Sequence, residues 1–522
     1  MKRHPFDVGR LQRRPALRGF ICAVALLQLL QACAGRTRPA ASPADDALLQ
    51  RILVAEDARG TGPEGTRPLL EGLASKDSTL RHTAARAFGR LGWAPVTSTA
   101  NRPFERRVPE ECARIAPRVH ADNPRTMLGA IDSLALCTPD ASDDGTARIG
   151  TLRAIAATLD PRDVPRKRNG VSWHAAAHAL VALAHAPSGA RAAADLLPRF
   201  VVHPRPQVRE YAARAAAQLK IGAVLLQLAA DADDNVRATA IAGLSQVGKH
   251  AYDSVYVAAL AASGYQVVLA GATALAGTTT PSAAPALLNS LDRLSAERRE
   301  NSRDERMMIL NRLAEFGAPG DAPRVERYLT DFDTTVAAKA ASMLTKWTGK
   351  PVVVHAQPLP IRAEPLAQLF RTRGMQLRIT MAKSSGGGTI VVRLFNDEAP
   401  ATIARIVRLA RAHYYDGLTF HRIVPGFVIQ GGSPGANEYV GDASFMRDET
   451  AVRFHLRGTL GISTRGHDTG DAQFFVNLID NRRLDNDYTV FGAVISGMDV
   501  VDQILESDVM ARVEIIGGKI PK

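Results

Sequence analysis

The sequence predicts a multidomain protein in which an α-helical solenoid of short repeats is followed by a closed antiparallel β-barrel with two capping helices. At 522 residues, the chain is longer than an ordinary single domain. Aromatic residues make up only 5% of it and alanine is abundant before residue 350, which is typical of helices packed through small side chains. After about residue 373, alternating apolar and polar residues between glycine-rich turns indicate strands.

The first 33 residues have the features of an export signal. A basic stretch precedes the apolar segment 20–30, which is too short to span a bilayer comfortably. The segment ends at Leu30-Gln31-Ala32-Cys33, which resembles the lipobox of bacterial lipoproteins. This resemblance implies cleavage before Cys33 and several acyl chains on it, which anchor a protein durably. The alternative is an ordinary secretory signal that is cleaved elsewhere.

The lipobox resemblance also implies where the protein resides. It places the protein in the bacterial cell envelope, lipid-anchored and facing the periplasm. Because Ala34 and not aspartate follows the cysteine, it implies the outer membrane in a bacterium with two membranes. Residues 34–46 are rich in proline, alanine and serine, which predicts a disordered tether.

The charge balance argues against a nucleic-acid partner. The net charge is +13, of which the leader supplies +5. The remaining surplus is small for a chain of this length, and no run of Lys and Arg with interleaved aromatic residues follows the leader. We therefore expect polypeptide partners and a membrane anchor, and no nucleic acid.

Residues 47–350 contain an internal repeat. An apolar residue followed by Arg, with Ala four positions after the apolar residue, begins clear copies at Leu80, Val208 and Val236. The spacing of 28 residues between the last two fits two helices of about 10–12 residues with their turns. The pattern resembles HEAT-like repeats, which implies helix pairs stacked into a solenoid. Such a solenoid is either a concave protein-binding surface or a rigid spacer, and the sequence leaves both open. Aspartates predicted to cap helices precede three copies, namely Asp77, Asp231 and Asp333.

Two cysteines remain after the leader and the anchor, Cys112 and Cys137. In an oxidising envelope, they either form a disulfide or stay as two buried thiols. The chain has no CxxC, no HExxH and no histidine pair at ligand spacing, so we expect no metal and no cofactor. The proline-rich segment 351–373 is predicted to be a linker, so we expect a domain boundary near residue 373.

Residues 374–522 are predicted to form the barrel. Two helices among about eight strands are typical of a closed barrel capped at its ends. The recognisable elements are a hairpin formed by Leu377–Met381 and Ile390–Phe395, a helix from Pro400, strands at 458–463 and 472–478, a turn and strand at 484–492, and a last helix at 498–505.

The stretch 420–432 contains the strongest candidates for functional residues. Its alternation around one Pro-Gly break predicts two short strands that bring Arg422, Phe427 and Gln430 close together. A cation, an aromatic ring and an amide beside apolar neighbours suit a site that holds an apolar group next to a carbonyl. His421 is predicted to be a structural hydrogen-bonding residue.

Four segments of this domain resemble the cyclophilin-type peptidyl-prolyl cis-trans isomerases in order and spacing. They are Tyr415–Gly432, Gln473-Phe474-Phe475, Leu484–Gly492 and Gly497–Asp502. The resemblance implies an isomerase that rotates X-Pro peptide bonds of proline-containing clients without a cofactor.

The same resemblance implies roles for individual residues. Arg422 would be the main catalytic residue, with Gln430 holding it and Phe427 beside it. Gln473 and the backbone of Thr464 would fix the peptide. The remaining pocket residues would be Val428, Phe475, Leu484 and Tyr488. Val428 and Tyr488 depart from the commoner Met and His of the family, and Arg483 stands where some members carry Trp, which implies weak sensitivity to cyclosporin.

Two other functions fit the same residues. One is a scaffold lipoprotein whose barrel binds proline-containing segments with little or no turnover. The other is an assembly platform in which the solenoid carries the main function through protein partners. The arginine in the family position favours the enzyme.

Overall fold

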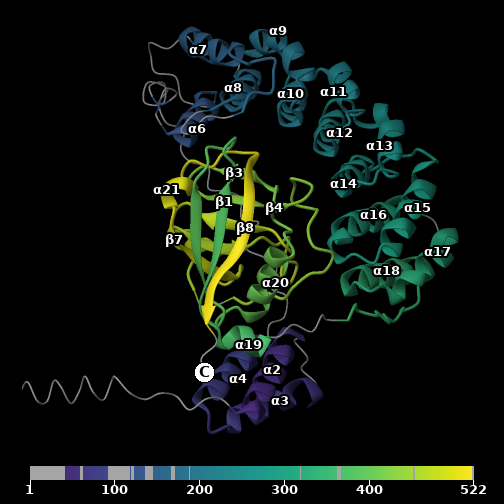
Figure 1. Cartoon of the computed structure of the whole chain (residues 1–522). Coiled ribbons are helices and arrows are strands. Elements are labelled where there is room, and N and C mark those ends of the chain that lie inside the picture. The colour runs from purple at the N-terminus through teal and green to yellow at the C-terminus, as the bar shows by residue number, and fades with distance from the viewer. Residues whose placement is uncertain are drawn as a thin grey trace, which may run out of the picture.

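The computed structural model describes residues 42–58, 63–91, 118, 121, 123–135, 145–165, 171–186, 188–317, 319–360, 366–450 and 453–519. The leader with Cys33, residues 34–41 of the tether, Cys112 and Cys137 lie outside these residues, so the predictions made for them stay predictions. Within the described part, a curved array of helices surrounds one side of a barrel, and a second group of helices lies beyond one end of the barrel (Figure 1).

The curved array begins at residue 124 and ends at residue 348. Consecutive helices pack side by side and follow an arc, as the repeat predicts (Figure 1). The helices are α6 (Pro124–Leu134), α7 (Thr146–Ala157), α8 (Trp173–His185), α9 (Ala190–Val201), α10 (Pro206–Gln218), α11 (Gly222–Leu228), α12 (Asp234–Gly248), α13 (Asp253–Ala259), α14 (Tyr265–Ala274), α15 (Ala283–Ala296), α16 (Arg303–Phe316), α17 (Ala322–Glu326) and α18 (Thr334–Thr348).

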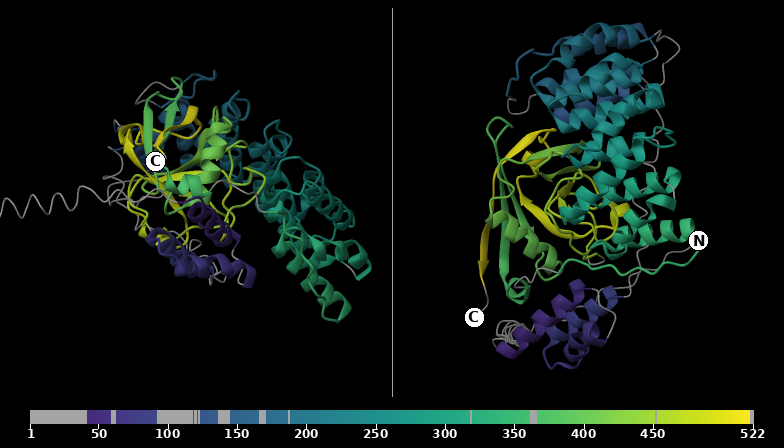
Figure 2. Two further views of the ribbon diagram at one scale, coloured as in Figure 1. Left: turned by 60° about the horizontal axis from the view of Figure 1, so that its bottom comes forward. Right: turned by 90° about the vertical axis from the view of Figure 1, so that its right-hand side faces the viewer.

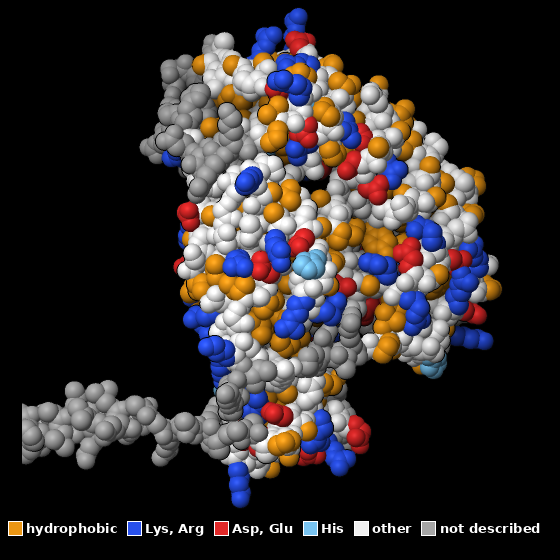
Figure 3. Space-filling view, viewed as in Figure 1, with side chains coloured by type: hydrophobic (Ala, Val, Ile, Leu, Met, Phe, Trp, Pro, Cys, Tyr) orange, Lys and Arg blue, Asp and Glu red, His pale blue; other side chains and the backbone are white. Residues whose placement is uncertain are grey.

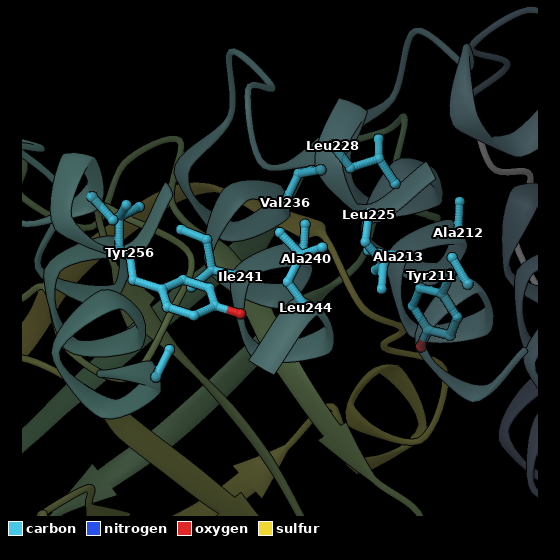
Figure 4. Close-up of a cluster of buried hydrophobic side chains, with 14 of the residues drawn as sticks. Tyr211, Ala212, Ala213, Leu225, Leu228, Val236, Ala240, Ile241, Leu244 and Tyr256 are labelled. Carbon is cyan, nitrogen blue, oxygen red and sulfur yellow. The ribbon is translucent and has the colours of Figure 1, made fainter. Parts of the chain in front are cut away.

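The repeat pattern is a packing pattern. The apolar residue and the alanine four positions later lie one turn apart on the same helix face. In α10 and α12 these are Val208 with Ala212 and Val236 with Ala240, and none of the four is exposed. The small alanines let neighbouring helices approach, and the leucines of α11 and α12 fill the space between them (Figure 4).

Two of the three predicted helix caps are present. Asp333 accepts hydrogen bonds from the N–H groups of Thr335 and Val336, and Asp77 accepts from Thr79 and Leu80. The third prediction is wrong, because Asp233 and not Asp231 caps α12. Asp231 instead forms an ion pair with Arg209 at 2.7 Å, which ties one repeat to the next.

The second group of helices comprises α2 (Pro43–Ala58), α3 (Pro63–Ala74) and α4 (Ser78–Leu91). The start of α2 corrects the predicted tether, whose last four residues are helical. Ser42 accepts a hydrogen bond from the Asp45 N–H at 3.1 Å and Pro43 occupies the first turn, which are favourable features of a helix start.

These three helices do not share the core of the arc. Their buried side chains pack with α19 (Leu366–Arg371) and the inside of the barrel, whereas the buried residues from α6 to α18 form a separate cluster. Gln50 accepts a hydrogen bond from the Ala367 N–H at 2.8 Å, and Arg86 donates to the Asp397 carbonyl. Figure 2 shows this group beyond one end of the barrel and the arc along its side. The helix α19, inside the predicted linker, was not foreseen.

The barrel is closed, with all strands antiparallel in the order β1-β2-β7-β5-β6-β4-β3-β8. This confirms the predicted barrel. Its strands are β1 (Arg373–Met381), β2 (Thr389–Leu394), β3 (Thr419–Val424), β4 (Val428–Ser433), β5 (Thr459–Ile462), β6 (Phe474–Asn477), β7 (Val490–Ser496) and β8 (Asp508–Lys519). Its helices are α20 (Pro400–Arg411) and α21 (Met498–Val501), the latter four residues shorter than predicted.

Candidate active site

The candidate site lies on the outer face of the barrel, across four neighbouring strands. Residues paired across strands point to the same face, so the register determines which side chains meet. Arg422 on β3 pairs with Gln430 on β4, Gln430 pairs with Phe475 on β6, and Phe475 pairs with Gly461 on β5. Their neighbours along the strands, such as Ile429 on β4, point into the barrel core.

A β-bulge places Arg422 on this outer face. Strict alternation would put Arg422 on the same face as Phe420, which is fully buried in the core. The pairing between β3 and β4 shifts between Phe420 and Arg422, so His421 is an additional residue in β3. Bulges of this kind redirect side chains next to functional sites.

The five side chains predicted to line a proline pocket come together. Val428, Phe475 and Leu484 form a small buried cluster that is separate from the barrel core, and Phe427 and Tyr488 pack against it. The cluster draws on β4, β6 and the short 3₁₀ helix Arg482–Leu484. An apolar pocket of this kind accepts a small apolar ring.

Phe475 is held at the centre of this pocket by aromatic neighbours. The Tyr488 ring meets it edge to face at 5.8 Å between centroids, and the His455 ring stacks on it at 5.8 Å. His455 is fully buried and lies 3.3 Å from an Asp485 oxygen. Burial lowers the pKa of His455 despite the nearby Asp485 carboxylate, which favours the neutral ring. Sequence reasoning missed His455, because nothing in segment 453–457 indicates a contact with β6.

A chain of hydrogen bonds begins at Arg422. Arg422 Nη1 donates to Gln430 Oε1 at 3.4 Å, and Gln430 Nε2 donates to Gln473 Oε1 at 3.2 Å. Gln473 Nε2 donates in turn to the carbonyl oxygens of Glu438 and Val440, at 3.1 and 3.2 Å. Both glutamines are buried, so each amide has a defined orientation and the guanidinium is held from one side.

Glu438 is the second partner of Arg422 and was not predicted. Its Oε1 lies 3.2 Å from Arg422 Nε, and each side chain is about two-fifths exposed. The Glu438 carbonyl also accepts a hydrogen bond from Arg465, which forms an ion pair with Asp304 at the start of α16. The loop that faces Arg422 is therefore fixed to both the barrel and the helical arc.

The remaining predicted residues border the same region. The guanidinium of Arg483 lies 4.2 Å from the centroid of the Phe427 ring, so a cation covers one side of the pocket. Thr464 follows β5, next to Ser463, whose N–H donates to the Gln473 carbonyl at 2.9 Å. Burial, together with the nearby Arg422 charge, lowers the pKa of His421 to about 4, and a hydrogen bond with the Thr419 backbone partly offsets this shift, in keeping with the structural role predicted for the residue.

The described residues contain no group of three or more His, Cys, Asp or Glu side chains that could hold a metal ion. None of the helices in the described ranges is long and apolar enough to cross a bilayer. What the site offers is an apolar pocket beside a cation that is oriented by two amides. That combination suits a reaction in which an apolar ring is held while charge develops on a neighbouring amide.

Comparison with known proteins identifies this domain. Residues 378–517 match the family described as cyclophilin type peptidyl-prolyl cis-trans isomerase/CLD. A peptidyl-prolyl cis-trans isomerase of Helicobacter pylori is 38% identical over 130 residues, which cover 24% of this chain and 80% of that protein. Peptidyl-prolyl cis-trans isomerase B of Bacillus subtilis is 38% identical over 133 residues, which cover 25% of this chain and 93% of that protein. Among solved structures, a cyclophilin-type isomerase of Cryptosporidium parvum has 22% identity and a TM-score of 0.26, and the match covers 27% of this chain and 99% of that one.

The fold and the site thus define a peptidyl-prolyl isomerase domain. The chain belongs to the cyclophilin-type peptidyl-prolyl cis-trans isomerase family.

Proposed function

We propose that the barrel catalyses rotation of X-Pro peptide bonds in polypeptide clients and that Arg422 is its main catalytic residue. Rotation is slow because amide resonance creates a barrier of about 18–20 kcal/mol. The twisted amide loses this resonance, so its nitrogen regains a lone pair that can accept a hydrogen bond. A donor positioned at that nitrogen stabilises the transition state more than the planar ground state.

The observation that carries this proposal is the position of Arg422 between two features. On one side lies the pocket of Val428, Phe475 and Leu484, which accepts the proline ring. On the other side Gln430 orients the guanidinium, and Gln473 orients Gln430. Phe427 lies beside the proline ring, Tyr488 closes the pocket, and Gln473 with the Thr464 backbone holds the peptide. The reaction needs no nucleophile and no cofactor.

Proline-peptide isomerisation by the full-length protein, with and without Arg422→Ala, tests this role. A charge-assisted hydrogen bond is worth about 1.5–3 kcal/mol, so we expect kcat/KM to fall about 10- to 100-fold. Arg422→Lys keeps the charge but loses the planar fork, and we expect an intermediate loss. The matched control is Arg378→Ala on β1, a half-buried strand arginine that pairs with Glu514 away from the site. Equal rates for Arg422→Ala and Arg378→Ala would refute the catalytic role.

The alternative is a proline-peptide-binding scaffold with little turnover. The ion pair between Glu438 and Arg422 is the observation that favours it, because a carboxylate partly offsets the positive charge that catalysis requires. A scaffold would bind a proline peptide with the same affinity whether or not it accelerates isomerisation. Peptide binding without any rate enhancement by the unaltered protein would decide for this alternative.

We further propose that the protein works in the bacterial cell envelope, anchored through a lipid on Cys33. The support is the sequence of the leader, with its basic start, short apolar segment and lipobox-like end. We expect Cys33→Ala to move the protein from the membrane fraction to the soluble fraction. Cys22→Ala, inside the leader, is the control and should leave the protein on the membrane. Continued membrane association of Cys33→Ala would contradict the lipid anchor.

The third part of the proposal is that the HEAT-like arc recruits clients for the barrel. Its support is that several helices of the arc contact the barrel directly. Tyr211 on α10 donates to Glu506 at 2.9 Å, and Asn235 on α12 donates to the Gly435 carbonyl at 3.0 Å. A spacer would hold the isomerase away from its surroundings, whereas this arrangement places the arc beside the site.

A further inference from the structure

A cavity of about 530 Å³ lies between the helical arc and the barrel, with Arg422 on its border. The helices α10, α12 and α14 form one side, and β3 with the loop 436–439 forms the other. The surface is hollowed between the arc and the barrel in Figure 3. The volume lies within the range of about 300–1,000 Å³ that is usual for ligand sites.

This cavity is not the proline pocket. Arg422 borders both, but the pocket residues Val428, Phe475 and Leu484 do not line the cavity. A peptide whose proline occupies the pocket therefore has a second site next to it, reached past the same guanidinium. The bulge at His421 contributes here, because that residue lines the cavity together with Arg422.

The cavity has a mixed polar and apolar lining whose charged groups nearly balance. Its three carboxylates already have partners: Glu210 pairs with Arg214 at 2.5 Å, Glu438 pairs with Arg422, and Glu506 accepts from Tyr211. The charges of Glu210 and Glu438 are therefore paired, and burial raises the pKa of Glu506, whose partner is the neutral Tyr211 hydroxyl. What remains are amide and hydroxyl groups, contributed by Gln207, Asn235, Thr239, Gln266, Asn437 and Ser507.

One buried polar atom in this lining lacks a hydrogen-bond partner in the described structure. Gln266 is only 8% exposed; its Nε2 donates to Asn235 Oδ1 at 3.0 Å, while its Oε1 has no hydrogen-bond partner in the described structure. Buried polar atoms are nearly always hydrogen-bonded in folded proteins, so this oxygen points to a ligand that carries a hydrogen-bond donor.

An extended polypeptide has that chemistry, because each residue presents one N–H donor and one C=O acceptor. We infer that the cavity between the arc and the barrel is a second peptide subsite, which binds the extended chain of the client next to the proline through its backbone. This inference rests on the proposed isomerase function and adds a substrate class to it. The preferred substrates are unfolded or extended segments, because a tight turn on a folded protein cannot enter between two rigid walls.

The walls are held at a fixed separation by contacts between the arc and the barrel. The His174 ring lies 2.9 Å from the Glu506 carbonyl, and Asn437 donates to Asn235 at 3.1 Å. A preformed subsite of this kind costs little reorganisation when a peptide binds.

The test compares peptides that share one X-Pro core, using the full-length protein. One is a tetrapeptide, and the others extend it by several polar residues on the N-terminal or the C-terminal side. We expect an extension on one side to lower KM about tenfold, which corresponds to about 1.4 kcal/mol. Equal KM values for all three peptides would overturn the inference while leaving the isomerase function intact.

A steric variant tests the location of the subsite. Ala238 on α12 lines the cavity, and Ala238→Phe fills part of it. The matched control is Ala242→Phe, one turn further along the same helix, where the side chain is exposed and outside the lining. We expect Ala238→Phe to abolish the advantage of the extended peptide and Ala242→Phe to preserve it. If both variants keep the advantage, the chain runs elsewhere and the inference is wrong.

A second variant, combined with a binding measurement, tests the subsite without relying on catalysis. Gln266→Met removes the unpartnered amide oxygen at nearly constant length and should weaken binding of the fluorescently labelled extended peptide several-fold in an anisotropy titration. Thr273→Val, at an exposed position of the same helix α14, is its control. Binding does not require turnover, so this measurement tests the peptide subsite separately from the isomerase function. An inactive barrel that still binds the extended peptide through Gln266 would refute the isomerase function alone.

Discussion

Gly461 is the position where a single methyl group should disable the candidate site. A Cβ atom at 461 would lie 2.4, 2.8 and 2.9 Å from three carbons of the Phe475 ring. Carbon atoms in contact normally stay about 3.5–4.0 Å apart, so Gly461→Ala forces the ring to retreat by about 1 Å. Phe475 is only 4% exposed and packs against Val428 and Leu484, so it has little room to move without narrowing the pocket.

The size of the effect follows from this displacement. Inserting a methyl group into a packed region costs about 1–3 kcal/mol of stability, which leaves the domain folded. A displacement of about 1 Å at a substrate-positioning residue costs up to about 100-fold in rate. We therefore expect Gly461→Ala to lower kcat/KM for a proline peptide about 10- to 100-fold, mainly through KM, because the proline ring loses its space.

Isomerisation kinetics and urea unfolding of the same samples check this prediction. The matched control is Gly150→Ala in α7, where a Cβ atom would meet nothing within 4 Å. Alanine is the better helix former by about 0.5–1 kcal/mol, so this control should be neutral or slightly stabilising and fully active. The prediction is refuted if Gly461→Ala has the same kcat/KM as the unaltered protein. It is also refuted if the loss of activity equals the fraction of the variant that is unfolded.

Two further predictions concern charges near the site. Glu438→Gln removes the carboxylate 3.2 Å from Arg422 Nε. Because this pair is partly open to solvent and such pairs are worth about 0.2–1 kcal/mol, kcat/KM should rise by no more than about fivefold and become less dependent on salt. A fall in kcat/KM would instead make Glu438 a positioning residue. Burial of Glu305 raises its pKa to about 8 from an ordinary value of 4.5. The folded state then binds the Glu305 proton more tightly than the unfolded state does. The stabilisation of the fold by this proton is therefore complete below pH 4.5 and is lost as the pH rises through 8. Urea unfolding should show the free energy of unfolding fall by up to about 1.4 kcal/mol per pH unit in this window, and Glu305→Gln should remove that slope.

Alternation and spacing predicted the barrel strands well. The hairpin of β1 and β2 falls within a few residues of its predicted bounds, because one face of each strand is buried and the apolar residues repeat with period two. The strands β5 and β6 also fall within a few residues of their predicted bounds, although every residue in them is buried. The repeat predicted the helix pairs of the arc for the same reason, since Val208 and Val236 occupy equivalent buried positions.

Other features depend on contacts between distant segments and left no local pattern. Asp231 and Asp233 are both suitable caps by composition, and only the ion pair with Arg209 assigns Asp231 a different role. The packing of α2 and α4 against the barrel, away from the repeats that follow them, depends on apolar surfaces that look alike in sequence.

The sequence by itself determined the composition of the candidate site. Arg422, Gln430 and the pocket side chains occur at the spacing of a known family, and the strand period places Val428 and Gln430 on the same face of β4. Only the tertiary structure decided how that site is completed. The bulge at His421 turns Arg422 out of the core, Glu438 reaches Arg422 on a loop held by Arg465, and the arc closes a cavity beside them. The physical reason is that a bulge, an ion pair and a cavity between domains arise from contacts between distant segments, which no local periodicity records.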